Sequence, residues 1–349
     1  ILDVFALAPD VKIERLFSPE HGISGQAEAG AAVGAQQARI PVISLYGKRT
    51  APTAEELSGI DTFVIDLQDV GARYYTYAAT MKACMKACAD ARVPVLVLDR
   101  PNPVGGLAIE GPTAVNTDSL VCWSAVPARH GMTMCEIAEW FRANDLKTSN
   151  VNLSVSMLDS WTPERLFGEC SLAWVPPSPN IPTPETALVY TGTCLFEGTN
   201  LSEGRGTDAP FVLIGAPWLD PDRVVAALPN EATAGLSFAP ASYTPRSIPG
   251  KAAKPKYMDE ACRGIRISVT NAHAARPFMT TVALLAAIRR NHAEQFKWEQ
   301  SFDVLAGSAE LRERIDRGDG PLQIVADYAA AHAEYEAKRP KLYVEQTTS

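Results

Sequence analysis

Three apolar runs in the first hundred residues each end in a dense polar cluster, and this repeated layout is the strongest constraint on the fold. The runs span residues 13–17, 62–65 and 93–98, and the clusters that follow them span residues 18–22, 66–73 and 99–103. Buried strands of a parallel sheet are continuous apolar runs rather than alternating ones. Ligands bind to open α/β sheets in the crevice beyond the carboxyl ends of the strands. The pattern therefore predicts a parallel sheet and the edge at which its functional site lies.

Helical segments separate these strands. Thr53 and Glu56 have the spacing of a capping box, and residues 80–91 carry a helical apolar face. A second capping box, Thr133 with Glu136, begins a helix that we expect to run to about residue 143. Further strands are expected at residues 41–46 and 153–157, and residues 1–7 have the pattern of a helix. The alternation of strand and helix predicts an α/β domain with a doubly wound, mostly parallel sheet.

The second half of the chain has a different character. Five prolines between residues 175 and 184 predict a domain boundary or a rigid crossing strap, because proline lacks a backbone donor and restricts the residue before it. Beyond it we expect a strand at residues 264–269 and helices near 278–291, 309–317 and 321–337. We therefore predict two domains, residues 1–170 and residues 171–349, the second a smaller α+β domain.

Composition excludes several classes of function. The formal net charge of −8 argues against a nucleic-acid or anionic-membrane partner, because both need a basic face. No apolar run approaches the length of a membrane span. Seven scattered cysteines fit neither a disulfide framework nor zinc spacing, and five histidines without an H-E-x-x-H motif predict no catalytic metal. The first strand–helix turn lacks G-x-G-x-x-G, so no nucleotide cofactor is expected.

The first polar cluster contains Glu20 and His21 between a proline and a glycine, which predicts a sharp turn at the end of a strand. A carboxyl group presented there acts as a general acid or base when partial burial raises its pKa. The structural alternative is that Glu20 only caps the next segment or pairs with an arginine.

The second cluster mixes carboxylates, a cation and aromatic rings within a dozen residues. Its members are Asp66, Gln68, Asp69, Arg73, Tyr74, Tyr75 and Tyr77. Sugar sites use such mixtures, since planar groups bind hydroxyls and rings cover C–H faces. The alternatives are tyrosines in the core and a structural Asp–Arg pair.

The third cluster contains Asp99, Arg100 and Asn102, whose flanking prolines would hold its amide in a fixed direction. A positioned amide suits an acetamido or carboxylate group, whereas Asp99 could instead cap a turn. His130 comes shortly before a capped helix, where a neutral imidazole is favoured.

A glycine-rich segment at residues 196–207 is the candidate contribution of the second domain. It contains Glu197, Asn200, Glu203 and Arg205. Glycines let a backbone approach a ligand closely, and the lysine and spacing of a phosphate-binding loop are absent.

Six motifs together resemble the NamZ family of exo-acting β-N-acetylmuramidases, formerly a domain of unknown function. The motifs occur in order over nearly the whole chain, at residues 17–22, 66–77, 98–103, 129–133, 177–183 and 196–207. The resemblance implies a Rossmann-like first domain, a smaller second domain and a cleft between them. It also implies an exported enzyme, periplasmic or secreted. Family members usually open with a strand and a Thr-Asn turn ahead of the first helix; this sequence begins at the helix, so we expect its start to be trimmed.

The activity implied by the resemblance is release of N-acetylmuramic acid from the non-reducing ends of peptidoglycan fragments. Glycoside cleavage usually needs two carboxyl groups, about 5 to 5.5 Å apart for retention and roughly 6.5 to 9.5 Å apart for inversion. We expect Glu20 to be the acid, with His21 beside it. The second carboxylate is left open among Asp69, Asp99, Glu197 and Glu203.

Substrate binding is expected from the remaining polar and aromatic residues of the motifs. Arg73, Arg100 and Arg205 are the candidate partners of the lactyl carboxylate, and the other candidates are Gln68, Tyr74, Tyr77, Asn102, His130, Asn180, Asn200 and Glu203. Two other classes of function are weighed against a glycosidase. One is a carbohydrate-binding protein without turnover; the other is an ester or amide hydrolase, for which no G-x-S-x-G elbow is present.

Overall fold

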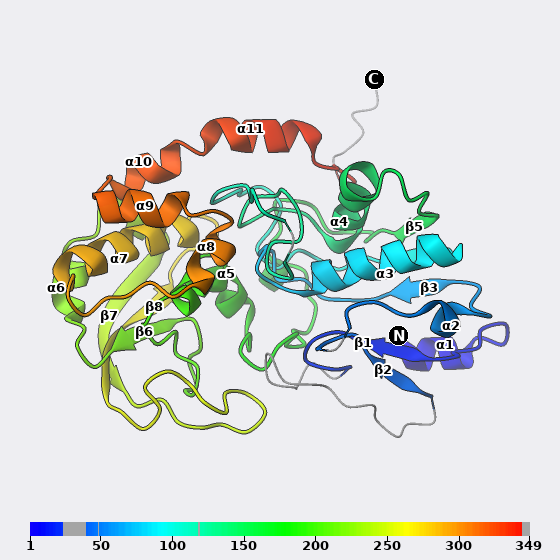
Figure 1. Ribbon diagram of the computed structural model, residues 1–349, viewed down its shortest axis with the longest axis horizontal. Coiled ribbons are helices and arrows are strands. Elements are labelled where there is room, and N and C mark those ends of the chain that lie inside the picture. The colour runs from blue at the N-terminus through cyan, green and yellow to red at the C-terminus, as the bar shows by residue number, and fades with distance from the viewer. Residues whose placement is uncertain (24–39, 48, 118, 344–349) are drawn as a thin grey trace.

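The computed structural model describes residues 1–23, 40–47, 49–117 and 119–343, which form two domains side by side (Figure 1). Each domain has its own buried apolar core. The core of the second domain continues into loops of the first, where it includes Val70, Tyr74 and Val104. The two domains are therefore joined by packed apolar side chains as well as by the chain itself.

Five short strands form the sheet structure of the first domain. β1 (Leu16–Ser18) pairs in parallel with β2 (Val42–Ser44). β3 (Phe63–Ile65), β4 (Val95–Leu98) and β5 (Leu153–Ser156) form a second parallel sheet in that order. All five strands lie within or beside the segments where the apolar runs predict them, and every pairing is parallel as expected.

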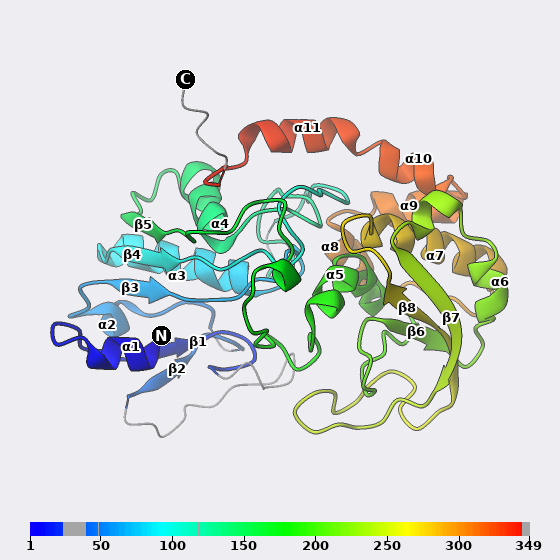
Figure 2. The same ribbon diagram turned by 180° about the vertical axis from the view of Figure 1, so that it is seen from behind.

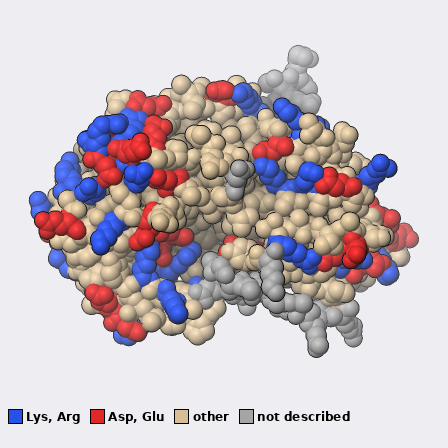
Figure 3. All heavy atoms as spheres, in the orientation of Figure 1, with Lys and Arg blue, Asp and Glu red and all other residues tan. Residues whose placement is uncertain are grey.

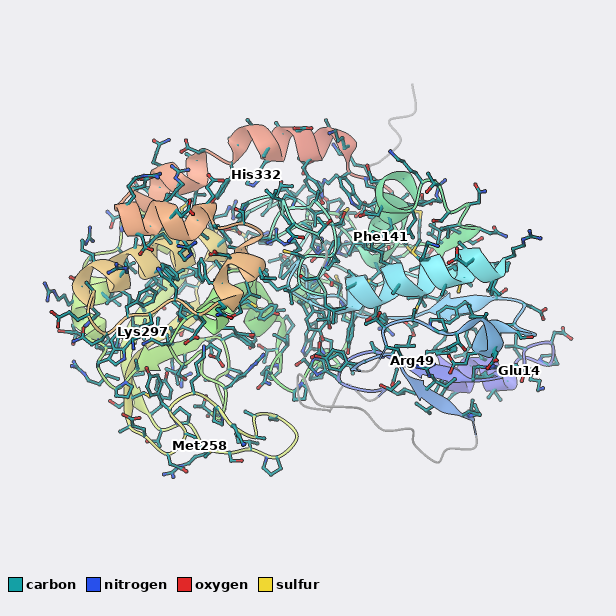
Figure 4. The ribbon with its side chains drawn as sticks, viewed as in Figure 1. Glu14, Arg49, Phe141, Met258, Lys297 and His332 are labelled. Carbon is teal, nitrogen blue, oxygen red and sulfur yellow. The ribbon has the colours of Figure 1, made fainter. Side chains whose placement is uncertain are left out.

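The helices of the first domain begin where the sequence signals indicate. α1 (Leu2–Leu7) opens the chain, and α2 (Ala54–Leu57) begins at the Thr53 capping box. α3 (Tyr77–Ala91) starts three residues before its apolar pattern. α4 (Met134–Trp140) begins at the Thr133 capping box and continues as a π-helical turn, Phe141–Asp145. Phe141 packs edge-on against Trp123 in the domain core, with ring centroids 5.4 Å apart (Figure 4).

Between the two parallel sheets lies a cavity of about 1060 Å³ with mostly apolar walls. Within the described residues β1 and β3 share no ladder, although the rings of Phe17 and Phe63 approach to 5.2 Å. Tyr77 and Pro177 also line this cavity. β1 and β3 are the strands next to the cavity. β2 lies beyond β1 on one side, and β4 and then β5 lie beyond β3 on the other.

The second domain has an antiparallel sheet with the order β6-β8-β7, with helices packed beside it (Figure 2). Its strands are β6 (Leu213–Ala216), β7 (Leu236–Tyr243) and β8 (Cys262–Val269). Its helices are α5 (Pro184–Thr193), α6 (Pro221–Val225), α7 (Pro277–Asn291), α8 (Ser301–Ala306), α9 (Glu310–Arg317) and α10 (Pro321–Ala326). Short 3₁₀ turns occur at Phe167–Glu169, Cys194–Gly198 and Asn230–Thr233. This is the α+β arrangement expected from the sequence.

The proline-rich segment contacts both domains. The hydroxyls of Tyr75 and Tyr77 each donate to the Pro177 carbonyl at 2.8 Å. Three residues further on, the Asn180 amide donates to the Lys251 carbonyl of the second domain at 2.9 Å. The segment therefore behaves as the crossing strap that its prolines predict.

The single helix expected at residues 321–337 is two helices, α10 and α11 (Ala329–Lys338). α11 returns from the second domain to the first, as both ribbon views show (Figures 1 and 2). Its Tyr335 hydroxyl donates to the His130 carbonyl at 2.6 Å, and His332 Nε2 lies 2.7 Å from the Gly111 carbonyl oxygen (Figure 4). The end of the described chain thus packs on the first domain.

A buried carboxyl group of α4 should make stability depend on pH. Burial raises the pKa of Glu136 to about 7, and nearby Asp99 raises it further while Arg339 opposes the shift. Its two oxygens accept the N–H groups of Thr133 and Leu342, each at 3.0 Å. A carboxyl whose folded pKa exceeds its unfolded value stabilises the fold fully below the unfolded pKa, and that stabilisation is lost as pH rises through the folded pKa.

We therefore expect the free energy of unfolding to fall by about 3 kcal/mol between pH 4.5 and pH 8 through this group. Glu136→Gln should remove that part of the dependence, measured as urea midpoints at pH 5 and pH 8. Glu139→Gln is the matched control, since Glu139 lies on the same helix in an outward ion pair with Arg142. Identical pH slopes for the two variants would contradict the assignment.

Candidate active site

Glu20 lies two residues beyond β1 in a tight turn. His21 and Gly22 both adopt left-handed backbone conformations, with φ of 69° and 72°, and the Gly22 N–H donates to the Pro19 carbonyl at 3.2 Å. A non-glycine residue at positive φ is uncommon and draws attention to the turn. Glu20 is 6% exposed, and the Thr76 hydroxyl donates to its Oε2 at 2.7 Å. The sharp turn that the sequence predicts is confirmed.

An aromatic cluster, formed by His21, Tyr75 and Tyr77, adjoins this turn. The His21 ring stacks on Tyr75 with centroids 6.3 Å apart and planes at 27°, and Tyr75 and Tyr77 lie 4.7 Å apart. Tyr74 faces the other way, into the core of the second domain, where it packs edge-on against Tyr190 at 6.2 Å. The sequence does not show which of three nearby tyrosines turns toward Glu20.

The second domain contributes the Glu197 cluster, which consists of Glu197, Glu203, Arg205 and Lys256. Arg205 Nη2 lies 2.8 Å from Glu197 Oε1, and its Nε lies 4.0 Å from Glu203 Oε1. Lys256 Nζ lies 3.4 Å from Glu203 Oε2 and also donates to the carbonyls of three residues, Phe196, Glu197 and Thr199. Charged side chains of the second domain gather beside a hollow between the two halves of the molecule (Figure 3). No sequence motif pointed to Lys256.

Charged groups of both domains affect the pKa of Glu197. Burial is the largest cause that raises the pKa of Glu197, and the charges of Glu203 and Glu20 raise it further, while Arg205 opposes them. Glu20 belongs to the first domain, so a charge of one domain contributes to the raised pKa of a carboxyl group in the other. The Glu197 side chain keeps 28% of its surface exposed. A reachable carboxyl with a raised pKa is a common mark of a catalytic site.

Asp69 and His130 form a buried pair behind this site. Asp69 Oδ2 accepts the Gly71 N–H at 2.6 Å and lies 3.2 Å from His130 Nε2. His130 Nδ1 accepts the Met132 N–H at 3.1 Å, whereas His130 Nε2 is buried and makes no hydrogen bond to the described residues. Asp69 Oδ1 is buried with no hydrogen-bond partner among the described residues.

Arg73 is fully buried, and its donors point to backbone oxygens. Nη1 donates to the carbonyls of Pro112 and Val126 at 2.9 and 3.0 Å, and Nη2 donates to that of Leu305 at 2.8 Å. Leu305 belongs to α8 of the second domain. These contacts give Arg73 a role in joining the domains.

The side chains of Asn102 and Asp99 also form hydrogen bonds with backbone groups. The Asn102 amide is held in one direction, as its prolines predict, but it donates to the Met132 carbonyl at 3.0 Å and accepts the Val104 N–H at 3.1 Å. Asp99 Oδ1 accepts the Cys135 N–H at 3.0 Å at the start of α4, and Oδ2 accepts the Tyr343 hydroxyl. Burial raises the pKa of Asp99.

The other candidate binding residues make contacts within their own domains or with the strap. Asn200 donates to the Gln295 carbonyl and accepts the Lys297 N–H, both at 2.8 Å. Gln68 donates to the carbonyls of Asp69 and Pro101 at 2.8 and 3.0 Å. Arg100 pairs with Asp66 at 2.7 Å and keeps 43% of its side chain exposed. The structure thus groups Glu20, His21 and Tyr77 in the first domain, shows an effect of the Glu20 charge on Glu197 of the second, and gives the rest contacts elsewhere.

No helix within the described ranges is long and apolar enough to cross a membrane. The same residues contain no group of three or more His, Cys, Asp or Glu side chains that could hold a metal ion.

Glycosidases use a pair of carboxyl groups, and Glu20 of the first domain with Glu197 of the second is the candidate pair in this structure. Residues 1–185 match the family described as "Exo-beta-N-acetylmuramidase NamZ, N-terminal", and residues 188–344 match its C-terminal counterpart. The chain therefore belongs to the NamZ family of exo-β-N-acetylmuramidases and is a glycosidase.

Relatives over the full length agree with this membership. The peptidoglycan beta-N-acetylmuramidase NamZ of Bacillus subtilis (strain 168) is 37% identical over 98% of this chain and 82% of its own length. Among solved structures, a DUF1343 family protein (BF0371) of Bacteroides fragilis NCTC 9343 superposes with a TM-score of 0.84 at 27% identity, over 98% of this chain and 89% of that one. A second protein of that strain (BF0379) has a TM-score of 0.73 at 26% identity, over 95% and 94% of the two chains.

Proposed function

We propose that the protein is an exo-acting glycoside hydrolase that releases N-acetylmuramic acid from the non-reducing ends of peptidoglycan fragments, by a carboxylate acid–base mechanism without a metal. The B. subtilis relative is a peptidoglycan beta-N-acetylmuramidase, which supports this substrate class. The observation that carries the mechanism is that Glu197, still 28% exposed, has a pKa raised chiefly by burial, with the charges of Glu203 and of Glu20 from the first domain raising it further.

In this mechanism Glu20 donates the proton to the leaving oxygen. Glu197 is the second carboxylate, because it is partly exposed and its raised pKa makes it a stronger base. Asp69, Asp99 and Glu203 are each at least nine-tenths buried, as Glu20 is, so Glu197 is the most exposed of the candidates for the second carboxylate. The pairings of Asp69 with His130, and of Asp99 with Tyr343, leave them less suited to meet a sugar.

We also propose that the first domain is a Rossmann-like doubly wound sheet. The order of strands reverses about the space between β1 and β3, which is the form of a topological switch point. Glu20 follows β1, and Gln68 follows β3. Ligands of open α/β sheets bind beyond the carboxyl ends of the strands at such a point, which supports a sugar site beside Glu20.

Release of a chromophore from a muramide glycoside, compared with the N-acetylglucosamine analogue, tests the proposal directly. We expect turnover of the muramide and much slower turnover of the analogue. Binding of N-acetylmuramic acid without any release of chromophore would instead identify a carbohydrate-binding protein.

Arg205 is the arginine of the Glu197 cluster, and we propose that it recognises the lactyl carboxylate. Arg205→Met should lower the ratio of kcat/KM for the muramide over the glucosaminide by about tenfold, because a charge-assisted contact present in one sugar is lost. Arg246→Met is a suitable control, since Arg246 is exposed and pairs with Asp259 on the same domain. Equal losses on both sugars would show that Arg205 acts only as a counter-ion to the acids.

We further propose that the protein acts in the periplasm or outside the cell, where peptidoglycan is found. Fractionation of cells that produce the full-length protein tests this, and recovery in the cytoplasmic fraction alone would contradict it.

A further inference from the structure

We infer that Thr76 is a positioning residue for Glu20, an inference that rests on the proposed function. Its hydroxyl donates to Glu20 Oε2 at 2.7 Å, although the two residues are 56 positions apart. Thr76 is the residue before α3, on the segment that follows β3, whereas Glu20 follows β1. The contact therefore bridges the two strands that border the proposed site.

Thr76 differs from the other threonines that begin α-helices in the described chain. Thr53, Thr133 and Thr183 each accept the N–H of the residue three positions on, at 3.3, 3.3 and 3.1 Å, as N-cap side chains ordinarily do. The Thr76 side chain makes no such bond, and its backbone is already helical, with φ of −79° and ψ of −11°. The hydroxyl of Thr76 is thus directed to Glu20 instead of to its own helix.

This contact restricts how the carboxyl group can turn. A hydroxyl has one proton to donate, so the bond from Thr76 holds Oε2 as an acceptor and leaves Oε1 as the oxygen for the acid proton. The backbone of Glu20 is already set by the left-handed turn at His21. Because Cγ, Cδ and the two oxygens of the carboxyl group lie in one plane, holding Oε2 fixes the rotation about the Cγ–Cδ bond and thereby the direction of Oε1. Catalysis depends on such placement, since a displacement of 1 Å can reduce a rate about a hundredfold.

Thr76→Val and Thr76→Ser separate positioning from folding. Thr76→Val removes the hydroxyl and should lower kcat on the chromogenic muramide by about tenfold or more, with KM changed less than about twofold. Thr76→Ser keeps the hydroxyl and should stay within about threefold of the unsubstituted kcat. Thr76 does not cap α3, so Thr76→Val should lower the thermal midpoint only through the donor lost by the buried Oε2 of Glu20, by a few degrees at most, and the variant should stay folded at the assay temperature.

Thr80→Val is the matched control. Thr80 lies one turn along the same helix, and its hydroxyl donates to the Thr76 carbonyl at 3.3 Å. We expect Thr80→Val to keep an unchanged kcat. The inference is overturned if Thr76→Val keeps full kcat, if Thr76→Ser loses as much as Thr76→Val, or if the loss follows a fall in stability shared with Thr80→Val.

The same assays distinguish this inference from the proposed function. If the unsubstituted protein is active, and Glu20→Gln inactivates it while Thr76→Val does not, the proposed function stands and Thr76 has no positioning role. If the unsubstituted protein shows no muramidase turnover, both the proposed function and the role of Thr76 are wrong.

Discussion

Glu20→Gln should lower kcat/KM for a muramide glycoside by about a thousandfold, because a positioned general acid contributes roughly 10² to 10⁴ to the rate. Glutamine has nearly the same shape and can still accept the Thr76 hydroxyl through its amide oxygen, so the fold should persist. The measurement is steady-state release of the chromophore, together with a thermal midpoint for each variant.

Glu169→Gln is the control for this substitution. Glu169 lies on the surface in an ion pair with His273, 2.8 Å from its Nε2, and it belongs to neither the turn nor the Glu197 cluster. We expect its activity to be unchanged. Near-normal turnover by Glu20→Gln would remove Glu20 from the mechanism and leave the acid to be sought elsewhere in the cleft.

Arg73→Met is expected to have the largest effect on stability, a loss of about 3 kcal/mol or more from the free energy of unfolding. Three backbone carbonyls, on Pro112, Val126 and Leu305, would lose a buried charged donor at once. Buried acceptors left without partners carry their full desolvation cost. Urea unfolding followed by tryptophan fluorescence measures the loss, and separate transitions for the two domains would show that Arg73 couples them.

Arg100→Met provides the comparison. Arg100 carries the same charge but is 43% exposed and pairs with Asp66 at the rim of the first domain. Exposed pairs contribute little, so we expect a change below about 1 kcal/mol. Similar losses for the two variants would mean that the carbonyl contacts of Arg73 do not stabilise the fold.

Several separate connections hold the two halves of the proposed site together. The strap is held at Pro177 by two tyrosines of the first domain, and α11 returns the chain to the His130 carbonyl. Arg73 adds a bond to α8. A site shared by two domains needs such support, because acid and base must remain within a narrow distance of one another.

Much of the local structure followed from local pattern. The apolar runs predicted parallel strands, the capping boxes at Thr53 and Thr133 predicted helix starts, and Pro19 with Gly22 predicted the turn that presents Glu20. The order of the six motifs predicted the family. The helix break after α10 was missed, since residues 327–328 carry no glycine or proline to mark it.

The partners of the polar residues were decided by tertiary packing. Arg73, Asn102 and Asp99 have the same residue types and neighbours that a ligand site would use, yet the fold surrounds them with backbone groups. No sequence pattern indicated a role for Thr76 or Lys256, because each forms its hydrogen bond with a residue more than fifty positions away in the chain.

The sequence by itself determined which backbone segments become strands, helices and turns, because those choices depend on neighbours within a few residues. Only the tertiary structure decided that the charge of Glu20 raises the pKa of Glu197, which is far away in the chain. The physical reason is that an electrostatic interaction depends on distance through space and on burial, and neither is written in the spacing of residues along a chain.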